Sequence, residues 1–87
     1  MNRALAIDIG GTKGEAGIVT VDGTIERRAR IASTDPADAD ELFSRVTQVI
    51  AEVRDDGEPE LVCGIGCGGP MRGGGATVSP LNIGAWR

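Results

Sequence analysis

The sequence predicts an α/β fold in which three antiparallel strands are followed by a helix and by a strand that returns to the same sheet. Three observations indicate this. Short apolar runs separated by glycine turns occupy the first third of the chain, a stretch with helical apolar spacing follows, and another apolar run then ends in a second glycine cluster. A strand, helix, strand crossover usually places its two strands parallel, so we expect the last strand to lie parallel to a neighbour.

The first three strands are expected at residues 3–9, 15–21 and 24–32. The first is a nearly continuous apolar run, which suits a strand buried on both faces. Asp22-Gly23 lies between two apolar runs and is a strong hairpin signal. The third strand carries Arg27, Arg28 and Arg30. Charge on an edge strand blocks the addition of further strands, so we interpret these arginines as edge protection and surface rather than a binding patch.

A helix is expected at residues 37–55. Asp35 or Asp38 can cap its start, and Pro36 fits a first helical turn. Gly57 with Pro59 predicts the helix end, and a fourth strand is expected at 60–66. The apolar side chains spaced to share one helix side, and so to pack against the sheet, are Leu42, Phe43, Val46, Val49, Ile50 and Val53.

The turn Asp8-Ile9-Gly10-Gly11-Thr12-Lys13 places a carboxylate, a hydroxyl and a cation at one strand end. A Gly-Gly pair allows positive φ and lets amide groups approach a ligand closely, as in an anion-binding nest. A carboxylate repels phosphates unless a cation lies between them, and Mg²⁺ commonly binds through one or two carboxylates, waters and substrate phosphates. The residues therefore favour a metal nucleotide. A plain tight hairpin, with Asp8 bonding local amides, remains the alternative.

Two other nucleotide motifs are excluded. The Walker A pattern requires Lys before Ser or Thr, whereas Thr12 precedes Lys13 here. The cluster Gly64-Ile65-Gly66-Cys67-Gly68-Gly69-Pro70 contains G-x-G-x-x-G, but Pro70 and further glycines follow where a dinucleotide fingerprint needs a helix. The cluster is instead interpreted as a loop with free backbone at a strand end, where open α/β sheets bind ligands.

Composition excludes several classes. The chain has 87 residues and a formal charge of −4, its basic residues are scattered, and Phe43 and Trp86 are its aromatic residues, so no nucleic-acid partner is expected. No run approaches the roughly 20 apolar residues of a membrane span, and no signal peptide is visible, so we expect a cytoplasmic protein without a membrane partner. Cys63 and Cys67 lack a second pair and a histidine, so no metal is expected through thiols.

With both glycine clusters in place, the sequence resembles the ROK family of sugar kinases and repressors, the glucokinase-like branch of the actin and heat-shock ATPase superfamily. The motifs that carry the resemblance are Asp8 to Lys13, Gly64 to Pro70, and Pro80-Leu81-Asn82 with Trp86. The resemblance implies a ribonuclease-H-like N-terminal lobe with strand order 3-2-1-4-5. Residues 1–87 would be a partial lobe, with the first four strands and one helix.

The resemblance also implies a function, the ATP-dependent phosphorylation of a hexose, with ATP and Mg²⁺ as cofactors. ATP phosphates and Mg²⁺ would bind at Asp8, Gly10, Gly11, Thr12 and Lys13, and the sugar at Gly69 and Asn82. The family's catalytic aspartate, in an Asn-Asp pair, falls beyond this segment, so no catalytic residue is assigned and the chain is expected to be inactive alone. Met71-Arg72 stands where the family often has an acidic residue. A homodimer of the full-length protein stays open, as do two alternative functions, a fragment of a sugar-responsive transcriptional regulator and a non-catalytic interaction module.

Overall fold

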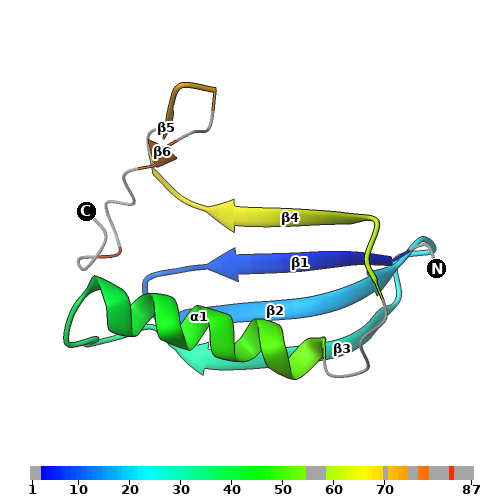
Figure 1. Cartoon of the computed structure of the whole chain (residues 1–87), viewed down its shortest axis with the longest axis horizontal. Helices are drawn as coiled ribbons and strands as arrows, with labels where there is room; N and C mark the ends of the chain where they lie inside the picture. Colours follow the sequence, from blue (N-terminus) through cyan, green and yellow to red (C-terminus); the bar gives the residue numbers. More distant parts are fainter. Residues whose placement is uncertain (1–2, 55–58, 70, 75–76, 79–82, 84–87) are drawn as a thin grey trace.

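The chain folds into a four-stranded sheet with one helix on one face and a small separate hairpin (Figure 1). The computed structural model describes residues 3–54, 59–69, 71–74, 77–78 and 83. Its elements are β1 (Arg3–Ile9), β2 (Lys13–Thr20), β3 (Ile25–Ala32), α1 (Ala39–Val53), β4 (Val62–Cys67), β5 (Met71–Arg72) and β6 (Thr77–Val78). In the described residues, no helix has the length and apolarity needed to cross a membrane. The expected mixed α/β fold is confirmed.

The strand order of the main sheet is β3-β2-β1-β4. Strand β1 pairs antiparallel with β2 and β2 pairs antiparallel with β3, whereas β1 and β4 are parallel. The connection through α1 carries the chain from the β3 edge to the β4 edge, past two strands. Figure 1 shows β1 and β4 pointing the same way, with α1 crossing in front of β2 and β3. Both sheet edges, β3 and β4, are therefore formed by strands that flank the helix in sequence.

The core lies between α1 and one face of the sheet. Its buried apolar residues are Leu5, Ile7, Ile9, Ala16, Ile18, Leu42, Val46, Val49, Val53 and Ile83. The expected helix stripe is observed except at Phe43, whose side chain is 60% exposed. Successive helix residues are about 100° apart, so Phe43 points away from the line that Leu42 begins. Packing thus uses a narrower side of the helix than the sequence predicted.

Strand β1 alternates between buried and exposed side chains, contrary to the expectation that both of its faces are buried. Leu5, Ile7 and Ile9 face α1, whereas Ala6 and Asp8 are exposed on the opposite side. The reason is that α1 covers one face of the sheet. The other face, on which Asp8 lies, is called the open face below.

Asp38 caps α1, and its carboxylate accepts a hydrogen bond of 2.8 Å from the Glu41 amide. The helix therefore begins at Ala39, so the expectation that Pro36 lies in the first turn is wrong. Asp38 has extended backbone angles, which stop the helix from continuing toward Pro36. The expected stop at Gly57 lies outside the described residues.

The β5–β6 hairpin was not anticipated, since the sequence predicted a loop at Gly64 to Pro70 and no strand after it. Met71 pairs with Val78 and Arg72 with Thr77. The backbone angles φ of Gly73 and Gly74 are +60° and +65°, values that glycine adopts without steric cost. Gly73 and Gly74 therefore serve the reversal of the chain between β5 and β6.

Candidate functional site

The two glycine segments leave the sheet at the same end. Strands β1 and β4 are parallel neighbours, and their last paired residues are Ile9 and Cys67. The Gly10–Lys13 turn follows Ile9, and Gly68 and Gly69 follow Cys67. The carboxyl ends of β1 and β4 lie at the same end of the sheet in Figure 1. Parallel α/β sheets commonly hold ligands at the carboxyl ends of such strands, so this end of the sheet is the candidate site.

The turn itself is held through its carbonyl groups. The Gly10 amide donates to the Lys13 carbonyl at 3.0 Å. The Ser33 hydroxyl donates to the Gly10 carbonyl at 2.6 Å, and the Ser33 amide donates to the Thr12 carbonyl at 3.0 Å. Within the described part of the chain, the amides of Gly11 and Thr12 have no acceptor. Two backbone donors therefore remain for an anion, as a phosphate-binding turn requires.

Ser33 is a site residue that the sequence did not predict, because it lies in the segment between the third strand and the helix. It is 5% exposed, and it directly follows β3. The pairing of Lys13 with Ala32 brings Ser33 next to the turn. A polar residue just after the third strand of a meander is the signal that could have indicated it.

The conformation of Gly10 and Gly11 differs from the sequence expectation, because neither residue has positive φ. A Cβ built on Gly10 would lie 3.3 Å from the Lys13 carbonyl oxygen, which is tighter than ordinary contact. Gly10 therefore permits a close approach of two backbone segments rather than an unusual φ angle. The physical reason for this close approach is the hydrogen bond from the Gly10 amide to the Lys13 carbonyl, which closes the turn.

Asp8 is exposed on the open face, where it pairs with Glu15 of β2 on one side and with Gly66 of β4 on the other. A Cβ built on Gly66 would lie 3.3 Å from Asp8 Oδ1, so glycine leaves the space beside this carboxylate open. No group of three or more His, Cys, Asp or Glu side chains gathers among the described residues. One exposed carboxylate on the strand that leads into this turn suits Mg²⁺, which takes few protein ligands when phosphates and waters complete its shell.

Lys13 shares the open face with Asp8, and a group of charges surrounds Glu15 beside it. Lys13 Nζ lies 3.8 Å from Glu15 Oε1, and Arg30 Nε lies 2.7 Å from the same oxygen. Arg28 Nε lies 3.9 Å from Glu15 Oε2. Arg28 and Arg30 of the edge strand thus contact this carboxylate instead of standing alone in solvent.

The two residues expected to contact the sugar are only partly described. Gly69 is exposed, and its φ of +124° lies in a region that other residues rarely adopt. Asn82, like Pro80, Leu81 and Trp86 of the same motif, lies outside the described residues. The structure therefore places Gly69 two residues after the strand that ends beside β1, and the sugar contacts of Gly69 and Asn82 stay predictions.

The crystal structure of a "putative sugar kinase" from Cytophaga hutchinsonii resembles the chain with a TM-score of 0.74 and 25% sequence identity. The chain thus has a sugar-kinase-like fold. The similarity covers 94% of this chain and 28% of that protein, so the chain spans little more than a quarter of the length of its structural relative. No protein-family model and no curated protein matches the sequence.

Proposed function

We propose that the chain is the phosphate-binding part of a ROK-type sugar kinase, which transfers the γ-phosphoryl group of ATP to a hexose hydroxyl. The observation that carries this proposal is that β1, which leads into the Gly10–Lys13 turn, and β4, which leads toward Gly69, are parallel neighbours that end together. The resemblance to the Cytophaga hutchinsonii protein supports it. The four strands would then be the first four of a ribonuclease-H-like lobe with strand order 3-2-1-4-5.

In this proposal the amides of Gly11 and Thr12 donate hydrogen bonds to ATP phosphate oxygens, and the Lys13 ammonium group adds positive charge. Asp8 holds Mg²⁺ through its carboxylate, in the space that Gly66 leaves open. Mg²⁺ supplies neutralisation of phosphate charge when it is bound. Phosphoryl transfer depends mainly on positioning and electrostatic stabilisation, so the fixed backbone of the turn is the contribution of this chain.

The sugar would bind beyond β4, at Gly69 and Asn82, so that its hydroxyl faces the phosphate turn. None of the 87 residues is assigned as the general base. The chain spans 28% of its structural relative, and we propose that the rest of a kinase supplies the base and the remaining nucleotide contacts. The 87-residue chain incubated with ATP, Mg²⁺ and glucose should therefore form no sugar phosphate. Robust phosphorylation would contradict this part of the proposal.

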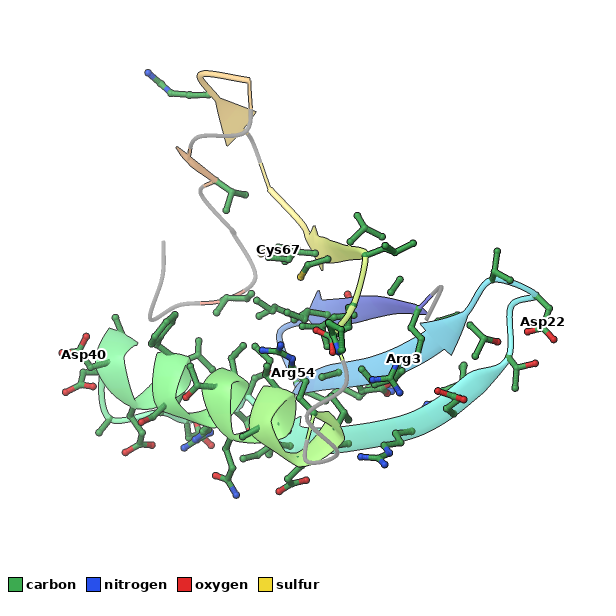
Figure 2. The ribbon with its side chains drawn as sticks, turned by 45° about the vertical axis from the view of Figure 1, so that its right-hand side comes forward. Arg3, Asp22, Asp40, Arg54 and Cys67 are labelled. Carbon is green, nitrogen blue, oxygen red and sulfur yellow. The ribbon has the colours of Figure 1, made fainter. Side chains whose placement is uncertain are left out.

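Binding tests the site directly. We expect a titration of the chain with ATP and Mg²⁺, followed by two-dimensional NMR, to shift the Gly11 and Thr12 amide signals. Asp8→Asn and Lys13→Gln should each weaken binding by about fivefold or more, since each removes a charge that contacts the ligand. Asp22→Asn is the matched control, because Asp22 lies at the β2–β3 hairpin tip (Figure 2), beyond the end of β2 that is opposite to Lys13.

Two results would contradict the proposal. One is the absence of Mg²⁺-dependent ATP binding, and the other is an equal effect of Asp8→Asn and Asp22→Asn. Either result would favour the sugar-responsive regulator or the interaction module, since neither of those functions requires a metal nucleotide at Asp8.

A further inference from the structure

One row of residues crosses all four strands on the open face. Asp8 on β1 pairs with Gly66 on β4 and with Glu15 on β2, and Glu15 pairs in turn with Arg30 on β3. Neighbouring strands are about 4.8 Å apart, so the backbone of Arg30 lies roughly 10 Å from that of Asp8. The edge strand is therefore within electrostatic range of the phosphate turn.

Glu15 poses a problem for a phosphate site, because its carboxylate lies directly across from that of Asp8. Like charges in directly opposite positions destabilise a sheet, and a second anion also repels phosphate. Arg30 offsets this charge. Its Nε contacts Glu15 Oε1 at 2.7 Å, whereas Lys13 Nζ lies 3.8 Å from the same oxygen. Glu15 thus has its closest cation on the edge strand, and Lys13 stays the more distant partner.

We propose that Arg30 is a positioning residue of the phosphate site and acts through Glu15. By neutralising Glu15, Arg30 keeps that carboxylate from competing with phosphate for Lys13 and from repelling the ligand. Arg28 assists on the other oxygen of Glu15, at 3.9 Å. This inference rests on the proposed function. If the arginines only protect the sheet edge, replacing them will leave ligand binding unchanged.

The test uses charge-matched variants of the whole chain and the same NMR titration with ATP and Mg²⁺. Arg30→Gln should weaken binding by about threefold to fivefold at low salt, and the effect should shrink at high salt. Adding Glu15→Gln to Arg30→Gln should restore affinity. Adding Glu52→Gln gives the same net charge but changes an exposed residue of α1, so it should restore nothing. Arg30→Lys keeps the positive charge and should keep most of the affinity.

The inference is overturned if Arg30→Gln binds like the parent chain, or if the Glu15 and Glu52 double variants bind equally well. It is also overturned if Arg30→Gln unfolds the chain while Arg28→Gln, which stays folded, binds like the parent. Loss of binding in Asp8→Asn and Lys13→Gln with normal binding in Arg30→Gln would overturn this inference alone. A parent chain that binds no ATP would overturn the proposed function and this inference together.

Discussion

Asp8 and Gly66 face each other across the β1–β4 pair, and a Cβ on Gly66 would lie 3.3 Å from Asp8 Oδ1. The pair links β1, in which Asp8 precedes the Gly10–Lys13 turn, with β4, in which Gly66 precedes Gly69. A larger residue on β4 would occupy the space in which the proposed Mg²⁺ binds. In the proposed site, Gly66 of the second glycine cluster thus leaves room beside Asp8 of the first.

Gly66→Ala should weaken the binding of ATP with Mg²⁺ by about threefold or more, because the added methyl group displaces the Asp8 carboxylate. The free energy of unfolding should change by no more than about 1 kcal/mol, since the alteration is one methyl group on an exposed strand. Gly64→Ala is the matched control, because a Cβ added to Gly64 would have no atom within 4 Å. Equal affinities of the two variants, measured by NMR titration, would contradict the role of Gly66.

Ser33→Ala should lower the free energy of unfolding by about 1–2 kcal/mol, because it leaves the Gly10 carbonyl without its buried donor. It should also speed hydrogen exchange at the Gly10 amide, as the turn loosens. Ser44→Ala, at an exposed helix position, is the control and should change stability by only a few tenths of a kcal/mol. Urea unfolding measures the free energy of unfolding of both variants. A Ser33 variant as stable as the Ser44 variant would show that the turn does not depend on Ser33.

Glu60→Gln should destabilise the fold by about 2–3 kcal/mol, since it removes a charge from a nearly buried ion-pair group. The Arg3 and Glu60 side chains are 5% and 7% exposed, and Arg3 Nη2 lies 3.8 Å from Glu60 Oε2. Arg54 Nε contacts the other oxygen of Glu60 at 2.8 Å. Glu52→Gln on the exposed side of α1 should have almost no effect. Thermal or urea unfolding decides, and a change below about 0.5 kcal/mol for Glu60→Gln would refute the prediction.

We expect the β2–β3 hairpin to be sensitive to acid through Asp22. A hydrogen bond from the Thr20 hydroxyl, together with one from the Thr24 amide, holds the pKa of Asp22 below its ordinary value of 3.8. Since the folded-state pKa is lowered, the stabilisation is fully present above pH 3.8 and is lost as the pH falls through the folded-state pKa. NMR titration of the Asp22 carboxyl group should give a midpoint below 3.8, and Thr20→Val should raise it. A midpoint at or above 3.8 in the parent chain would contradict this account.

Several features of the fold could be read from short stretches of sequence. Asp22-Gly23 indicated the β2–β3 hairpin, Asp38 was one of two expected helix caps, and the apolar spacing from Leu42 to Val53 indicated the buried side of α1. These features depend on backbone preferences and on side-chain periodicity within one element. Burial was harder to predict at Phe43 and along β1, because it depends on which surfaces another element covers.

The local sequence by itself determined the four strands of the main sheet, the helix and which residues stand at the Asp8 to Lys13 turn, but not the β5–β6 hairpin. Only the tertiary structure decided that Gly66 lies beside Asp8, that Ser33 holds the turn, and that Arg30 contacts Glu15. The reason is that strand order and register join residues far apart in the chain, and a register shift of one residue would send each side chain to the other face. A turn can fix the register of a hairpin, but β1 and β4 are joined through α1, so no turn sets the register that places Gly66 beside Asp8.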